Sequence, residues 1–144
     1  MLCRLIYRST VVPPFDFDDL RSILAASERN NPPQGITGVL MTASMQFLQV
    51  MEGPSDNINE LYRTLQRDTG HEHLRLVEFT AIQQRLFDGW AMRGVHRRLM
   101  SDELTTFLTK KYGSDESGHL TLPSTAFLAT SLLFDVANTD IIGT

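Results

Sequence analysis

The chain has 144 residues, of which 42% are hydrophobic and 21% are charged, a composition typical of one soluble globular domain with its own core. A net charge of −4 disfavours nonspecific nucleic-acid binding, and the single cysteine, Cys3, excludes an internal disulfide and a cysteine-based metal cluster. No apolar run reaches the roughly 18 residues of a membrane span, and the N-terminus lacks a signal-peptide core. We therefore expect a cytoplasmic protein that contacts neither nucleic acid nor membrane.

The first thirty residues predict a strand, a loop and a helix. Leu2–Tyr7 is a short β-type apolar run, and the two prolines within Thr10–Phe17 indicate a loop. Asp18–Arg29 has apolar residues at helical spacing, and the acidic pair Asp18 and Asp19 suits the positive end of the helix dipole. The dipole explains this pair better than a catalytic role for paired carboxylates.

The middle of the chain predicts a hairpin, a second helix and two more strands. The turn Pro32-Pro33-Gln34-Gly35 precedes two apolar runs, and Ser55 or Asp56 is a candidate N-cap for a helix that ends near Asp68. The remaining strands are expected at Ile36–Thr42, Gln46–Met51, His73–Ile82 and Gly89–His96. The order is β-α-β-β-α-β plus a fifth strand, which predicts a ferredoxin-like α+β fold with a mixed sheet, two helices on one face and the C-terminal helices on the other.

Residues 98–144 are expected to form a helical extension of a domain that spans residues 1–97. Asp102–Tyr112 is predicted to be helical after a Ser101 cap, and Pro123–Asn138 is a strongly apolar second helix. The uncovered face of the sheet is the natural place for this apolar helix, and an oligomer interface is the competing one.

Gln49 interrupts an apolar strand, Phe47-Leu48-Gln49-Val50-Met51, whose neighbours favour burial. Its side chain carries two amide donors and a carbonyl acceptor, and leaving these unpaired in a core costs about 1–3 kcal/mol. Gln49 therefore requires a polar partner inside the fold, either a protein group or a bound ligand.

Common enzyme signatures are absent: the sequence has no G-x-S-x-G, H-E-x-x-H, P-loop or G-x-G-x-x-G after a strand. His71 and His73 suit a metal ion only if both lie on one face, so we expect no metal site. Trp90 and Met92, two residues apart on the last predicted strand, are expected to point the same way. Taken singly, they and Tyr7 are best interpreted as core residues.

Taken together with Asn31 and Gln49, these residues resemble the BLUF family, blue-light sensors that use a flavin. The segments that carry the resemblance, in order over residues 2–96, are Leu5-Ile6-Tyr7-Arg8-Ser9, Ser27-Glu28-Arg29-Asn30-Asn31, Gly35-Ile36-Thr37-Gly38, Phe47-Leu48-Gln49-Val50-Met51-Glu52-Gly53, Leu61-Tyr62-Arg63, Asp68, His71 and Arg85-Leu86-Phe87-Asp88-Gly89-Trp90-Ala91-Met92. Each segment is weakly specific by itself, and the ordered set is highly specific. The tail resembles the two-helix extension of short, stand-alone members.

The resemblance implies a noncovalent FAD whose ring lies between two helices on one side of the sheet. Asn31 would hold its polar edge, and Gln49 would bridge the flavin and the Tyr7 hydroxyl. The other residues implied in cofactor binding are Ile23 and Leu65 on the two faces of the ring, Ser27, Asn30, Asp68 and His71 near the ring edge or ribityl chain, Met92, and Arg63 or Arg67 at the phosphates. Gly70 stands where many members have arginine and Thr64 where some have a basic residue, so FMN or riboflavin are alternatives to FAD.

The resemblance also implies a mechanism in which Tyr7 donates an electron and a proton to the excited flavin, and Gln49 rotates or tautomerises. The photoactive set would be Tyr7, Gln49, Trp90 and Met92, with the last strand relaying the change to the C-terminal helices. Either Trp90 or Met92 would lie beside Gln49.

The leading hypothesis is a blue-light sensor without catalytic turnover that signals to an unidentified downstream protein and forms a homo-oligomer. A flavin-binding redox enzyme or a ferredoxin-like small-molecule binder is the first alternative. A structural interaction module with an empty pocket is the second.

Overall fold

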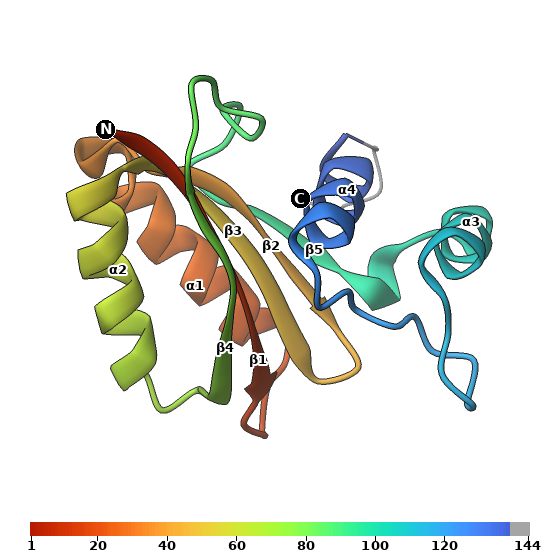
Figure 1. Cartoon of the computed structure of the whole chain (residues 1–144). Helices are drawn as coiled ribbons and strands as arrows, with labels where there is room; N and C mark the ends of the chain where they lie inside the picture. Colours follow the sequence, from red (N-terminus) through yellow and green to blue (C-terminus); the bar gives the residue numbers. More distant parts are fainter. Residues whose placement is uncertain (139–144) are drawn as a thin grey trace.

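The computed structural model, which describes residues 1–138, is a single mixed β-sheet with helices on both faces (Figure 1). Its strands are β1 (Leu2–Val11), β2 (Thr37–Ala43), β3 (Gln46–Pro54), β4 (His71–Ala81) and β5 (Arg93–His96). Its α-helices are α1 (Phe17–Asn30), α2 (Ser55–Arg67), α3 (Asp102–Tyr112) and α4 (Ala126–Ala137). Within residues 1–138, no helix combines the length and the apolar character required to cross a membrane.

The sheet has the strand order β4-β1-β3-β2-β5, with β1 and β3 side by side at its centre. The pairs β1–β3, β1–β4 and β2–β3 are antiparallel, and β2–β5 is parallel. Helices α1 and α2 cover one face, and α4 crosses the other (Figure 1). This arrangement confirms the predicted ferredoxin-like α+β fold with a fifth strand and a mixed sheet.

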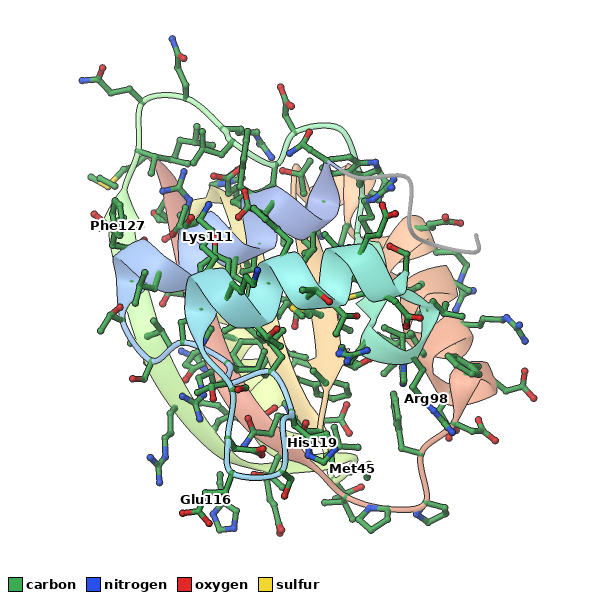
Figure 2. All side chains as sticks on the ribbon, turned by 90° about the vertical axis from the view of Figure 1, so that its right-hand side faces the viewer. Met45, Arg98, Lys111, Glu116, His119 and Phe127 are labelled. Carbon is green, nitrogen blue, oxygen red and sulfur yellow. The ribbon has the colours of Figure 1, made fainter. Side chains whose placement is uncertain are left out.

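Helix α4 packs its buried side chains against the sheet. Ala129, Leu132 and Leu133 are fully buried in a core that also contains Val39, Val50 and other residues of the strands. Lys111, near the end of α3, pairs with Asp135 of α4 at 2.9 Å, so the two helices also contact each other (Figure 2). The sheet thus covers one side of the apolar helix, as the first of the two alternatives expected.

The outer side of α4 remains exposed. Phe127 is 82% exposed, and Leu128 and Phe134 are more than two-fifths exposed; Phe127 marks the beginning of the helix in Figure 2. Residues 139–144, the last part of the predicted extension, lie outside the described residues.

Several predicted boundaries differ from the structure. Strand β1 continues to Val11 because Thr10 still pairs with Gln46 of β3 and Val11 with His71 of β4, so Tyr7 lies within the strand and not at its end. Helix α1 begins at Phe17 and has a capping box between Asp16 and Asp19. Helix α2 begins after Pro54 and has no side-chain cap, so the predicted cap at Ser55 or Asp56 is wrong.

The predicted strand Gly89–His96 begins only at Arg93. Two backbone carbonyls before that point have partners outside the sheet ladder: Trp90 O accepts from Gly38 N at 3.1 Å, and Ala91 O accepts from the Asn31 side chain at 2.8 Å. The chain bends at Ala91, and this bend ends the period-2 alternation. Trp90 therefore packs against the α4-side core and Met92 lies in the α1/α2-side core, so the prediction that they point the same way is wrong.

Candidate functional site

A pocket of about 360 Å³ lies between α1, α2 and the sheet, within the size range of small-molecule sites. Its walls come from elements far apart in sequence, because α1 and α2 cross the same face of the sheet (Figure 1). The predicted site residues that line it are Tyr7, Ile23, Ser27, Asn31, Gln49, Leu65, Asp68 and His71. The structure thus brings most of the predicted set together.

Tyr7, Gln49 and Met92 form a chain of contacts at the floor of the pocket. Tyr7 on β1 is directly opposite Gln49 on β3, and its hydroxyl donates a hydrogen bond to Gln49 Oε1. The other end of the amide, Nε2, donates to Met92 Sδ at 3.4 Å. A thioether is a weak hydrogen-bond acceptor. Among these contacts, the two amide protons of Gln49 therefore have no strong acceptor. Met92, and not Trp90, is the neighbour of Gln49.

The Tyr7 hydroxyl is held in its neutral form. The side chain is 1% exposed, and burial raises the pKa of Tyr7 far above its usual value, with the negative charge of Asp68 as a second cause. The neighbouring Tyr62 ring lies 6.0 Å away, and burial raises the pKa of Tyr62 as well. Tyr7 therefore keeps its proton throughout the physiological range and remains a hydrogen-bond donor to Gln49.

Asn31 connects the end of α1 to the segment that leads to β5. Its backbone N–H caps the helix by bonding Ser27 O at 2.8 Å, and its side-chain amide donates to Ala91 O. The residue is 4% exposed and lines the pocket. Asn31 therefore fixes the exit of α1 through its backbone and the approach of the chain to Met92 through its side chain.

His71 lies on the same side of the sheet and is hydrogen-bonded through both ring nitrogens. Its Nε2 lies 2.7 Å from Leu65 O, and its Nδ1 lies 2.7 Å from Ser9 Oγ. A carbonyl oxygen only accepts, so Nε2 carries a proton and donates it to Leu65 O. His73 instead is exposed and lies beside Glu72. Within residues 1–138, no group of three or more His, Cys, Asp or Glu side chains is arranged to hold a metal ion.

Five other residues singled out from the sequence lie outside the pocket lining. One of them, Met92, reaches the site through its contact with Gln49. Asn30 and Arg67 are exposed, Arg63 is exposed and pairs with Glu60, and Trp90 packs against the α4-side core. Arg67 is two residues beyond Leu65, and residues two apart on a helix do not share a face. The phosphate contact assigned to Arg63 or Arg67 and the contact assigned to Asn30 stay predictions.

The pocket also uses residues that the sequence reasoning did not select, including Leu40, Phe47, Leu61 and Phe15. Phe47 is two residues from Gln49 on β3, and Leu61 is one helical turn before Leu65, so the same periodicities could have indicated both. Phe15 comes from the loop before α1 and stacks edge-on against Phe47, with ring centroids 5.3 Å apart. No local pattern identifies this loop residue as part of the site.

The lining combines apolar side walls with a polar floor and edge. Ile23 of α1 and Leu65 of α2 contribute apolar walls, while Asn31 and Gln49 contribute amides. This arrangement fits a flat, largely apolar ring with hydrogen-bonding atoms along one edge. Among the residues that the structure describes, the lining includes two carboxylates, Asp19 and Asp68, and no arginine or lysine. These lining residues supply no cationic partner for a phosphate.

Sequence comparison assigns the domain to a family. Residues 2–93 match the BLUF family, whose description is sensors of blue-light using FAD. The beta subunit of the photoactivated adenylate cyclase of Euglena gracilis is 29% identical over 101 residues, which cover 69% of this chain and 12% of that protein. The chain therefore spans about an eighth of the length of this curated relative.

Solved structures agree with that assignment. The dark-state structure of the BLUF protein BlrB is 33% identical, covers 78% of this chain and 81% of its own, and superposes with a TM-score of 0.69. The ground state of BlsA, at 24% identity, has the same fold over 99% of this chain and 91% of its own, with a TM-score of 0.83. The chain belongs to the BLUF family of blue-light sensors that use FAD.

Proposed function

We propose that this chain senses blue light by the hydrogen-bond chain of Tyr7, Gln49 and Met92 beneath a noncovalently bound FAD. The observation that carries the proposal is the amide of Gln49, which lies between a strong donor, the Tyr7 hydroxyl, and a weak acceptor, Met92 Sδ. Exchanging the two ends of that amide alters every one of these contacts without altering the shape of the site.

The residues of the pocket fit the ring of a flavin. Ile23 and Leu65 would lie against its two faces, and Asn31 and Gln49 would hold its polar edge. Ser27, Asp68 and His71 would lie toward the ribityl chain, and Asn30 and Arg67 farther out. FMN and riboflavin have the same ring as FAD and would fit the same ring site, since the described lining has no cationic side chain that selects for the FAD phosphates.

The chemistry divides between cofactor and protein. A bound flavin supplies a strong oxidant when it absorbs blue light. Tyr7, which is neutral and hydrogen-bonded to Gln49 Oε1, would donate an electron and a proton to the excited flavin and would take both back as the flavin returns to its oxidised form. Gln49 then rotates or tautomerises, so that a donor replaces the acceptor that faced the Tyr7 oxygen, and its carbonyl end moves toward the position of Met92.

The output of the sensor is a protein contact and not catalytic turnover. Gln49 of the pocket contacts Met92, which leads into β5, and α4 on the other face of the sheet exposes Phe127 and Phe134 on its outer side. An unidentified downstream signalling protein and a second copy of this chain are the proposed partners.

An absorption spectrum of the purified protein before, during and after blue illumination tests the proposal. We expect structured flavin bands and a red shift that reverses in darkness, and we expect Gln49→Leu to abolish the shift while the flavin stays bound. Gln46→Leu is the matched control, since Gln46 lies on the same strand outside the pocket lining and should leave the shift intact. A flavin that only bleaches, or a normal shift in Gln49→Leu, would refute the mechanism and favour a flavin redox enzyme.

A further inference from the structure

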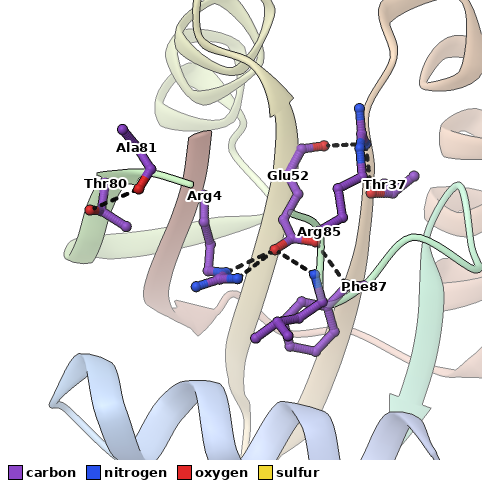
Figure 3. Close-up of polar contacts among 8 residues, drawn as sticks. Arg4, Thr37, Glu52, Thr80, Ala81, Arg85 and Phe87 are labelled. Atoms are coloured by element: carbon purple, nitrogen blue, oxygen red, sulfur yellow. Dashed lines mark hydrogen bonds and ion pairs between the residues drawn. The ribbon is translucent and has the colours of Figure 1, made fainter. Parts of the chain in front are cut away.

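Glu52 is a buried carboxylate on the face of β3 opposite the pocket. It is 0% exposed, and it lies three residues from Gln49 on a strand without irregular pairing to β1 or β2. Residues three apart on a regular strand point to opposite faces. Figure 3 shows its carboxylate directed toward the side of the sheet that carries α4.

Both carboxylate oxygens of Glu52 accept hydrogen bonds. Arg4 Nε and Nη2 lie 2.9 and 2.8 Å from Oε2, which also accepts from Leu86 N at 3.1 Å. Oε1 accepts from Phe87 N at 2.8 Å (Figure 3). A buried carboxylate that accepts from two guanidinium nitrogens of Arg4 on one oxygen and from two backbone N–H groups is well compensated, and its geometry is stiff because each partner is directional.

Arg85 attaches the same segment to the sheet from a second direction. Its guanidinium donates to Thr37 Oγ1 at 2.8 Å, Glu52 O at 3.0 Å and Gly35 O at 2.6 Å. Residues 85–87 are therefore fixed by both the side chain and the main chain of Glu52. We call Arg4, Glu52, Arg85, Leu86 and Phe87 the Glu52 cluster.

The other end of this segment is attached to the pocket. Ala91 O accepts from Asn31, and Met92 Sδ accepts from Gln49, both of which line the pocket. Residues 85–92 thus run from the Glu52 cluster to the amide that the proposed photochemistry rearranges. A displacement of Met92 therefore acts on a segment whose other end, residues 85–87, is hydrogen-bonded to Glu52.

The end of the segment that is bonded to Glu52 also contacts α4. Phe87 is fully buried, and its ring packs edge-on against Phe134 of α4 with centroids 6.4 Å apart. Because the backbone N–H of Phe87 is bonded to Glu52, the position of this ring relative to the helix depends on the Glu52 carboxylate.

We propose that Glu52 is a positioning residue for light signalling, which holds residues 85–87 so that rearrangement at Gln49 and Met92 reaches α4 through Phe87 and Phe134. The inference rests on the proposed function and adds to it the residue on which transmission depends. If Glu52 did not hold this segment, the segment would absorb the displacement and α4 would not respond.

The test compares amide hydrogen exchange of α4 in light and in darkness, on the full chain with bound flavin, together with the absorption shift. Glu52→Gln keeps the size of the side chain but replaces one acceptor oxygen with an NH2 donor. Either the donors on Oε2, which are Arg4 and Leu86 N, or the donor on Oε1, which is Phe87 N, then lose their acceptor. We expect the wild type to show a reversible red shift and a light-dependent change in exchange over residues 126–137. We expect Glu52→Gln to keep the red shift and lose the change in α4.

Two controls separate signalling from stability. Glu60→Gln makes the same substitution at an exposed residue of α2, and Ile58→Val removes one buried methylene from α2, outside the Glu52 cluster. Both should keep the red shift and the α4 response.

Phe134→Leu keeps the proposal testable if Glu52→Gln does not fold, because Phe134 is 44% exposed and its replacement leaves the cores intact. It should lose the α4 response and keep the shift. A wild-type-sized response in Glu52→Gln or Phe134→Leu, or a red shift without any α4 response in the wild type, would overturn the role of Glu52. A wild type without a red shift would instead overturn the proposed function.

Discussion

The polar side chains on the two faces of the central strand β3 differ in how completely they are hydrogen-bonded. Gln49 faces α1 and α2, beside an open pocket, and within residues 1–138 its amide nitrogen donates only to a thioether, Met92 Sδ. Glu52 faces α4, is fully buried, and has Arg4 and two backbone N–H groups on its two oxygens.

This difference distinguishes Glu52, whose hydrogen bonds stabilise the fold, from Gln49, which can change its hydrogen-bond partners. A buried polar group with all its hydrogen bonds made is costly to disturb, whereas one with a weak partner beside a cavity has an alternative at little cost. Because side chains alternate along a strand, the two behaviours occur three residues apart in β3. The α4-side face is therefore expected to determine stability, and the pocket-side face to determine spectral response.

The largest expected effect on stability lies on the α4 side. Leu132 is fully buried between α4 and the sheet, so Leu132→Ala should lower the free energy of unfolding by about 2–5 kcal/mol through lost burial and a residual cavity. Urea unfolding measures the loss. The reversible red shift should persist wherever the variant is folded, since Leu132 is absent from the pocket lining.

Phe127→Ala is the matched control on the same helix. Phe127 is 82% exposed, so its replacement should change the free energy of unfolding by no more than about 0.5 kcal/mol. A loss of unfolding free energy from Phe127→Ala as large as that from Leu132→Ala would show that another surface covers the outer side of α4 in solution. The stability of the α4 side would then depend on that interface as well as on the core.

Periodicity was sufficient to predict most of the fold. The order of strands and helices, and the placement of Asp102–Tyr112 after a Ser101 cap, are confirmed. The failures lie where tertiary contacts override local pattern. Trp90 and Met92 separate because Gly38 and Asn31 take the carbonyls of Trp90 and Ala91, and no local pattern indicates partners more than fifty residues away.

The site was predictable where a buried polar residue conflicted with its apolar surroundings. Gln49 required a partner on that ground alone, and Tyr7 is one. Glu52 satisfies the same criterion in the same strand, but in the sequence it precedes Gly53-Pro54, where a glutamate is unremarkable at a turn. Its burial depends on Arg4 and on the chain at Leu86 and Phe87, which only the fold brings together.

A smaller effect is expected from Asn31 on the pocket side. Asn31→Ala should lower the free energy of unfolding by about 1–3 kcal/mol, because Ala91 O loses the donor that the structure shows. The variant should also retain less flavin, measured as the ratio of flavin to protein absorbance after purification.

Asn59→Ala provides the control, since the Asn59 side chain also donates to a backbone carbonyl, Ser55 O, but lies exposed on α2. It should change stability by no more than about 0.5 kcal/mol and leave flavin content unchanged. Equal effects of the two substitutions would mean that Asn31 acts only as a helix-end residue, and the pocket side would lose one of its two proposed polar contacts.

The smallest effect expected is a dependence on alkaline pH, and it isolates the buried hydroxyl on the pocket side. Burial raises the pKa of Tyr7, so above the unfolded value of about 10 the unfolded chain releases a proton that the folded chain keeps. The unfolded state then binds fewer protons, and the free energy of unfolding falls as pH rises, by about 1.4 kcal/mol per pH unit from this group. Urea unfolding of the wild type and Tyr7→Phe between about pH 9 and about pH 11 measures the difference in slope. Parallel curves for the two proteins would show that Tyr7 ionises as readily in the fold as outside it, and that the pocket floor is open to water.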